Sequence, residues 1–289
     1  MKFGIHYIDF LPGQPEKLAS TLAATVKATE DAGVDMFTLA DHFFQMETFG
    51  SATDPFLEGY TSMGYLAALT ERITLSMLVT GVTYRHPGVL AKIVTTLDVL
   101  SGGRSMFGIG AAWYDREHRA LGIPYPPLKD RFEMVEETLK ICLQMWSEYD
   151  GAYHGTHYQL AETICQPQPI RRPPILIGGT GEKKTLRLVA QYADVWNGTC
   201  SLEELPHKLD VLRRHCDTVG RDFSEIRLTA GNFDDPFIAV DDYLRTLDQY
   251  AALGIDTINT APWPGNPDPA GWVKRLGDEV IPRVTTSPG

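Results

Sequence analysis

The side chains best suited to acid–base chemistry stand together at Asp41 and His42, directly after the apolar run of residues 36–40. An imidazole accepts or donates a proton near neutral pH, and a carboxylate can orient or bind a ligand. We therefore interpret His42 as a catalytic residue, and Asp41 as a catalytic or ligand-binding one. Consecutive residues of a strand point to opposite faces, so the two need not contact each other. The alternative is an aspartate that caps a helix beside a histidine packed in the rim of the fold.

A second candidate site is a glycine-rich segment between an apolar run and a helix pattern, made up of Gly178, Gly179, Thr180 and Gly181. Lys183 and Lys184 follow it, in the predicted first turn of the helix. Backbone N–H groups and the dipole at a helix N-terminus attract phosphate, so we predict that this loop and Lys183 bind a phosphate group. The segment lacks the GK[ST] ending of a P-loop. A tight turn with two solvated lysines is the alternative.

Small residues followed by aromatic ones could form the walls of a pocket for a flat ring. We predict ring contacts at the ends of two apolar runs, from Leu78, Val79 and Thr80 and from Ala111 and Trp113. Further candidates for an aromatic lining are Phe43, Phe44, Trp196 and Trp263. The sequence has no complete dinucleotide fingerprint, no HExxH, no zinc-type Cys/His spacing and no GxSxG. We therefore expect neither a metal site nor a serine nucleophile.

The elements that must position these residues alternate between strand and helix along the whole chain. We predict eight strands, near residues 2–7, 36–40, 73–79, 104–110, 174–178, 194–197, 226–229 and 256–260. The segments between them carry apolar residues every three or four positions, as amphipathic helices do, and Asp130 with Glu133 suggests a capping box at the start of one. Such alternation implies parallel strands, either closed into a (β/α)8 barrel or left as an open doubly wound sheet. In a barrel, the carboxyl ends of the strands carry the active site.

Length and composition fit this architecture. A chain of 289 residues, 43% hydrophobic and 22% charged, can form one (β/α)8 domain over residues 1–289. Residues 147–172, rich in Tyr, His, Gln and Pro, are predicted to form an inserted loop or hairpin over one barrel end.

Charge and cysteine content restrict the partners and the compartment. The net charge of −11 argues against a nucleic-acid partner. No apolar run approaches the length of a membrane span, and the chain starts as a strand rather than as a signal peptide. The four cysteines form no CxxC pair, so we expect reduced thiols and a cytoplasmic protein. The expected partner is a small-molecule substrate.

Three segments of the chain resemble the luciferase-like superfamily, which contains bacterial luciferase and F420-dependent oxidoreductases. They are ADHF at residues 40–43, TYRHP at residues 83–87 and LDVLSGGR at residues 97–104, of which the last is the most specific. The resemblance extends over roughly residues 1–285, and it is greatest to actinobacterial proteins of unknown substrate. It implies a barrel with a flavin or deazaflavin ring across its carboxyl face.

The resemblance also carries expectations for particular residues. It implies a non-prolyl cis peptide at Leu78-Val79, bulging toward the ring, and it places His42 near the carbon that exchanges hydride. The sugar-phosphate dehydrogenase branch has a glutamate after the fourth strand, where this chain has Ala111 and Ala112, so a sugar phosphate is not the expected substrate.

The function expected from the resemblance is that of an F420-dependent oxidoreductase acting on a small organic molecule, in a homodimer. The cofactor phosphate should lie on residues 178–181, with Arg85, Lys183 and Lys184 as candidates to bind the polyglutamate tail of F420. An FMN-dependent monooxygenase and a non-catalytic flavin-binding protein are the two alternatives.

Overall fold

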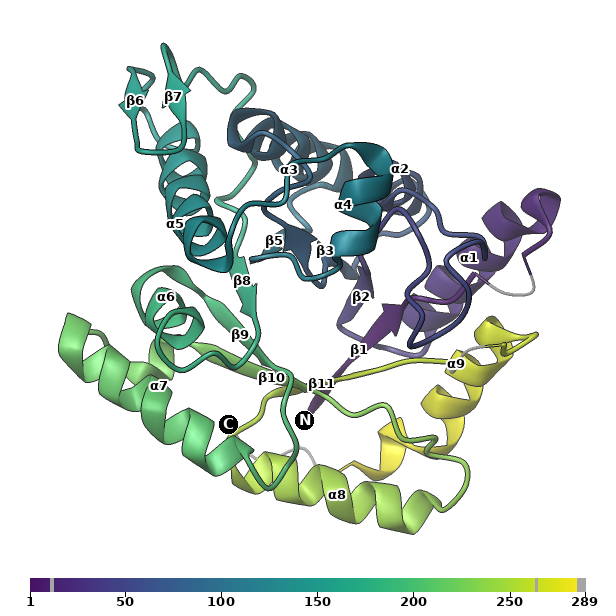
Figure 1. Cartoon of the computed structure of the whole chain (residues 1–289). Helices are drawn as coiled ribbons and strands as arrows, with labels where there is room; N and C mark the ends of the chain where they lie inside the picture. The colour runs from purple at the N-terminus through teal and green to yellow at the C-terminus, as the bar shows by residue number, and fades with distance from the viewer. Residues whose placement is uncertain (11–12, 263–264, 285–289) are drawn as a thin grey trace.

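The strands of the main sheet are parallel and close into a barrel, because β3 pairs with β2 on one side and with β5 on the other (Figure 1). The computed structural model describes residues 1–10, 13–262 and 265–284. Its eight barrel strands are β1 (Lys2–Tyr7), β2 (Met36–Leu39), β3 (Thr74–Met77), β5 (Ser105–Gly110), β8 (Ile175–Gly178), β9 (Val195–Gly198), β10 (Arg227–Gly231) and β11 (Thr257–Thr260). The predicted (β/α)8 barrel is therefore confirmed, and the open-sheet alternative is wrong.

Helices cover the outside of the barrel. They are α1 (Pro15–Asp31), α2 (Gly59–Ala67), α3 (Pro87–Ser101), α4 (Asp115–Leu121), α5 (Leu128–Met145), α6 (Thr185–Tyr192), α7 (Leu205–Val219), α8 (Val240–Ala252) and α9 (Pro269–Glu279), with the short 3-10 turns η1 (Phe223–Glu225) and η2 (Ile281–Arg283). The two ends of the chain meet, because β1 pairs with β11 and α1 packs against α9. No helix in the described part of the chain is long and apolar enough to cross a membrane.

One local prediction about a helix is wrong, and one short helix was missed. The helix α5 begins directly after Pro127, and no side chain caps it, so Asp130 and Glu133 form no capping box. Asp130 lies in the first turn, where its charge complements the helix dipole. The short helix α4 was not predicted; it begins at Asp115 and ends at Gly122, whose φ of 70° is left-handed.

The inserted segment 147–172 was predicted to be a loop or a hairpin. It contains a two-stranded antiparallel hairpin of β6 (Tyr153–His154) and β7 (Gln159–Leu160). Its position differs from the prediction. The backbone N–H groups of Thr156, His157 and Tyr158 donate to the carboxylate of Glu137 on α5. The hairpin thus packs on the outer side of α5 at the edge of the molecule (Figure 1), not over the mouth of the barrel.

The LDVLSGGR segment that carries the family resemblance has a structural role. Asp98 accepts hydrogen bonds from the backbone of Ile170 and from the hydroxyl of Ser105. Arg104 donates to the carbonyl oxygens of Ala67 and Thr70, at the end of α2. These bonds fix the connections at the amino-terminal end of the barrel, away from the site described next.

Candidate active site

A cavity of about 710 Å³ opens at the carboxyl ends of the barrel strands, where the active sites of such barrels lie. Its size is within the range of small-molecule and cofactor pockets. Most of the predicted site residues line it, namely Asp41, His42, Leu78, Val79, Thr80, Ala111, Trp113, Gly178 and Gly179. The cavity therefore brings together four segments that lie far apart in the sequence.

The peptide bond between Leu78 and Val79 is cis, as predicted, and it separates β3 from the two-residue strand β4 (Thr80–Gly81). Val79 faces two glycines of the neighbouring strands. A Cβ atom at Gly110 would lie 2.8 Å from a methyl carbon of Val79, and one at Gly178 would lie 3.2 Å from the other. The absence of side chains at these two glycines makes room for the bulge at Val79 on the wall of the cavity.

Asp41 is buried and forms a two-pronged ion pair with Arg85. The guanidinium donates to the two carboxylate oxygens of Asp41 at 2.6 and 3.0 Å, and also to Glu58. Burial disfavours the charge on Arg85, but the two carboxylates outweigh it and raise its pKa. Arg85 is thus less accessible to the polyglutamate tail than was predicted, because its side chain is only 11% exposed and donates to Asp41 and Glu58.

His42 is held by Glu117, which was not predicted as a site residue. The Nδ1 of His42 and Oε1 of Glu117 are 2.8 Å apart, and the hydroxyl of Tyr84 donates to the same carboxylate. The backbone N–H of Phe43 donates to the second oxygen at 2.8 Å. Burial opposes the ionisation of Glu117, but these hydrogen bonds together hold its pKa below the usual value. Because an ionised carboxylate only accepts, Nδ1 of His42 carries a proton and Nε2 remains for a ligand.

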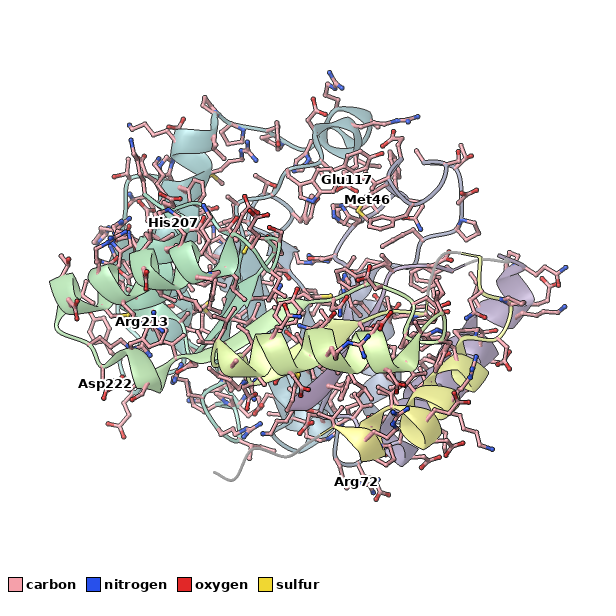
Figure 2. All side chains as sticks on the ribbon, turned by 90° about the horizontal axis from the view of Figure 1, so that it is seen from below. Met46, Arg72, Glu117, His207, Arg213 and Asp222 are labelled. Carbon is pink, nitrogen blue, oxygen red and sulfur yellow. The ribbon has the colours of Figure 1, made fainter. Side chains whose placement is uncertain are left out.

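The helix α4 brings Glu117 to this position. The next residue, His118, donates from Nδ1 to the carbonyl oxygen of Tyr114 at 2.7 Å and accepts from the hydroxyl of Thr83 at 2.6 Å. Met46 lines the cavity and packs against Tyr114, and Figure 2 shows Met46 and Glu117 at the same corner of the molecule.

Aromatic rings surround the imidazole of His42, with ring centroids between 5.5 and 6.3 Å away. They belong to Phe56, Tyr84, Trp113 and Tyr114. The other described aromatic residues proposed as lining do not line the cavity. Phe43 packs against Tyr84, Phe44 packs on the small cluster around Met46, and Trp196 is fully buried. Trp263 lies outside the described residues.

A second imidazole, that of His6 at the end of β1, lines the cavity and was also missed. The hydroxyl of Thr38 donates to the carbonyl of Ile5, so it accepts from Nδ1 of His6, at 2.9 Å. Burial and the neighbouring His42 lower the pKa of His6 to about 4, and Thr38 offsets only part of this. His6 is thus neutral at pH 7. A polar residue within the apolar first strand was the signal that could have identified it.

The glycine-rich loop divides between two adjoining cavities. Gly178 and Gly179 line the main one, whereas Gly181 and Thr185 line a smaller one of about 350 Å³ that shares Gly178 and Ala111 with it. Lys183 and Lys184 were predicted to lie in the first turn of the helix. The helix α6 begins at Thr185, so both lysines lie instead in the turn before it. The amine of Lys184 lies 5.4 Å from the ring of Phe132, which also lines the smaller cavity.

The wall between these cavities has an unusual backbone. Ala112 has a φ of 57°, in the left-handed region that residues other than glycine rarely adopt. Arg131 of α5 donates to the carbonyl oxygens of Ala111, at 2.9 Å, and Ala112, at 2.5 Å. Within the described part of the chain, no group of three or more His, Cys, Asp or Glu residues could hold a metal ion.

Comparison with known proteins agrees with this arrangement. A model of the luciferase-like monooxygenase family matches residues 1–242. The chain belongs to this family. An F420-dependent glucose-6-phosphate dehydrogenase of Microbacterium testaceum is 32% identical over 167 residues, which cover 57% of this chain and 48% of that relative. The match thus spans about half the length of the dehydrogenase.

Two solved structures of similar size share the fold of this family member. An F420-dependent tetrahydromethanopterin reductase from Methanopyrus kandleri superposes with a TM-score of 0.80 at 16% identity, over 98% of this chain and 99% of the reductase. An F420-dependent secondary alcohol dehydrogenase, in complex with an F420–acetone adduct, has a TM-score of 0.82 at 15% identity, over 99% of both chains. Other solved structures with this fold include a monooxygenase from Streptomyces bottropensis, at a TM-score of 0.77 and 18% identity over 99% of this chain and all of that one.

Proposed function

We propose that the protein is an F420-dependent oxidoreductase that moves a hydride between the deazaflavin and a small organic substrate. The observation that carries the proposal is the placement of His42, fixed by Glu117, on the wall of a cofactor-sized cavity beside the Leu78-Val79 bulge. The F420-dependent relative in Microbacterium testaceum supports the choice of cofactor.

The residues of the cavity fit a tricyclic ring that carries a phosphate chain. The ring would lie against Leu78, Val79 and Thr80, with Ala111 and Trp113 on the other side. The glycines at positions 110 and 178 leave space that any side chain would fill. The phosphate would lie on the loop of residues 178–181, near the start of α6, with Lys183 and Lys184 nearby. The N–H of Gly179 donates to the carbonyl oxygen of Asn197, so the donors would be the N–H groups of Thr180 and Gly181. When bound, the deazaflavin supplies the centre that accepts or donates the hydride.

His42 would supply the proton step. Oxidation of an alcohol removes a hydride from carbon and a proton from oxygen, and Nε2 of His42 is the acceptor available for that proton. Glu117 would stabilise the resulting imidazolium and keep the ring in one orientation, while Tyr84 holds Glu117. Asp41 would act indirectly, because its carboxylate is bound to Arg85 and fixes the segment that carries His42.

Equilibrium titration with F420 and with FMN tests the choice of cofactor. We expect the intrinsic fluorescence of F420 to change on binding with a micromolar or lower dissociation constant, and FMN to bind at least about tenfold more weakly, a difference of about 1.4 kcal/mol. Tight binding of FMN and no binding of F420 would instead favour the flavin-dependent monooxygenase.

We further propose that residues 1–289 act as one catalytic domain in a cytoplasmic homodimer. The four free cysteines are consistent with a reducing compartment. The molecular mass in solution tests this assembly.

A further inference from the structure

We infer that the substrate is an uncharged, largely apolar molecule with a hydroxyl or carbonyl group, and that Glu204 excludes anionic molecules from the site. The inference rests on the proposed function, because it concerns the part of the main cavity that a bound cofactor would leave open. Glu204 lines this cavity together with Thr199, Cys200 and Ser201, all of which follow β9.

The lining of the cavity contains no counter-ion for an anion. None of the described residues that line it is a lysine or an arginine. Residues 11–12 and 263–264, which the structure does not describe, contain no basic residue either. His6 is neutral at pH 7 and cannot take the role of a cation. An anion in the part of the cavity beside Glu204 therefore finds no lysine or arginine side chain to replace its hydration.

Three basic residues around the cavity are already engaged in ion pairs. Arg85 is bound to Asp41 and Glu58, and Arg116 of α4 is bound to Glu47. Lys208 of α7 forms an ion pair of 2.6 Å with Glu182. These pairs cancel the positive charge that could otherwise attract an anionic substrate.

Glu204 adds a negative charge at the position where an anion would otherwise bind. It is the residue before the first turn of α7, a helix N-terminus that favours negative charge. Its carboxylate accepts from the backbone N–H and the hydroxyl of Ser201, at 3.2 and 3.1 Å. Among the described residues, no lysine, arginine or histidine forms an ion pair with it. The exposed carboxylate of Glu204 thus lies beside the N-terminus of α7, although it makes no capping hydrogen bond to the helix.

The remaining walls suit an apolar body with one polar group. Ile8, Met46, Phe49 and Phe233 line the cavity from the loops after β1, β2 and β10. The polar groups beside them that can bind an uncharged oxygen are Nε2 of His42 and the buried amide of Asn197. An alcohol or carbonyl compound satisfies these groups, whereas a phosphate or carboxylate faces Glu204 without a cation.

The experiment uses the full chain loaded with F420 and a matched pair of ligands, cyclohexanol and cyclohexyl phosphate. Binding is followed by the fluorescence of the bound deazaflavin, so no turnover is needed. We expect cyclohexanol to bind and cyclohexyl phosphate to bind at least roughly tenfold more weakly, because the phosphate meets a like charge. Glu204→Gln should strengthen binding of the phosphate ester by about threefold or more, with the effect decreasing as salt is added, and Glu204→Lys should strengthen it further.

Glu203→Gln is the matched control. Glu203 is exposed, as Glu204 is, and its replacement changes the net charge equally, but Glu203 does not line the cavity. Cyclohexanol affinity should stay within about twofold in Glu203→Gln, and in the two Glu204 variants it should change less than the affinity for the phosphate ester, since an uncharged ligand is insensitive to the charge. Failure of F420 to bind, measured before any ligand is added, would refute the proposed function itself. With F420 bound, the inference is overturned if the phosphate ester binds as tightly as cyclohexanol, if cyclohexanol does not bind, or if Glu203→Gln and Glu204→Gln have equal effects.

Discussion

At the scale of single residues, the site depends on two imidazoles in different environments. His42 is hydrogen-bonded to a carboxylate, whereas His6 is hydrogen-bonded to a hydroxyl and buried. Glu117 fixes the orientation of the His42 ring and leaves Nε2 for a ligand, whereas burial lowers the pKa of His6. We therefore assign proton transfer to His42 and a neutral, ligand-lining role to His6.

The role of His42 is tested by His42→Ala. We expect the variant to bind F420 with nearly unchanged affinity, and the turnover number to fall by about 100-fold or more, the usual effect of losing a general acid or base. His154→Ala, in the exposed hairpin strand β6, is the control and should change neither quantity. Fluorescence titration measures the affinity, and the absorbance of the oxidised deazaflavin measures the turnover. Unchanged turnover would make His42 a packing residue.

The burial of His6 predicts a pH dependence of stability. Its pKa is about 4 in the folded protein and 6.5 in a solvated histidine. Between these values the unfolded chain takes up a proton that the folded protein does not, so the free energy of unfolding falls as the pH is lowered through this window. The full effect is roughly 3 kcal/mol.

His6→Asn should remove this component, because its amide nitrogen can replace Nδ1 as the donor to Thr38 and does not titrate. Urea unfolding from pH 7 to pH 4 measures the free energy of unfolding of both proteins. We expect the wild-type protein to lose about 2–3 kcal/mol more than the variant over this range. Parallel pH profiles would show that His6 is not the titrating group.

At the scale of elements, the strands could be predicted because each is a short apolar run between turn residues, and all eight were found close to their predicted positions. Once the strands are known, the residues that directly follow them can be assigned to the carboxyl end of the barrel. Glu117 could not be found in this way. It is 75 residues from His42 and lies on α4, a helix of seven residues whose pattern is too short to be distinctive.

The polar partners of the predicted residues were missed for a related reason. Arg85 was assigned to the cofactor tail because an arginine at the mouth of a barrel is a plausible anion ligand. Its actual partner, Asp41, is 44 residues away, and the sequence alone does not show that the two side chains meet. Pairing between loops depends on the three-dimensional order of the strands, which apolar periodicity does not specify.

The fit of β3, β5 and β8 around Val79 is tested by Gly110→Ala. The new Cβ would lie 2.8 Å from Val79, so we expect a loss of about 1–3 kcal/mol of unfolding free energy and weaker binding of F420. The double variant Gly110→Ala/Val79→Ala removes the contact and should recover most of the stability. Gly64→Ala on α2 meets no atom within 4 Å and is the control. Normal F420 affinity in Gly110→Ala would place the ring elsewhere.

At the scale of the whole molecule, an acidic protein with a net charge of −11 has to bind an anionic cofactor. The turn that carries Lys183 and Lys184 brings positive charge close to the smaller cavity. In contrast, Arg85 is paired with Asp41 and Glu58, and the guanidinium of Arg131 is bound to the carbonyl oxygens of Ala111 and Ala112. The rest of the positive potential comes from the N-terminus of α6. Long-range repulsion between the protein and the cofactor should therefore depend on salt.

Charge reversal at Lys183 and Lys184 tests this division. The double variant to glutamate should weaken F420 binding by about tenfold at low salt, and by less at high salt, because screening reduces the interaction. Reversal of Lys17 and Lys27, which are exposed on α1, changes the net charge equally and is the control. Titrations at two salt concentrations measure the effect. If the double variant binds F420 as the control does, only the backbone of residues 178–181 binds the phosphate.

The central claim is that a deazaflavin lies between the Leu78-Val79 bulge and His42. A crystal structure of the protein in complex with F420 tests it most directly. We predict that the ring contacts Val79, and that Nε2 of His42 is within about 4 Å of the ring or of a ligand bound on it. The phosphate should accept from the N–H groups of Thr180 and Gly181, in the loop of residues 178–181. A ring bound outside this cavity, or His42 turned away from it toward Glu117 alone, would contradict the account.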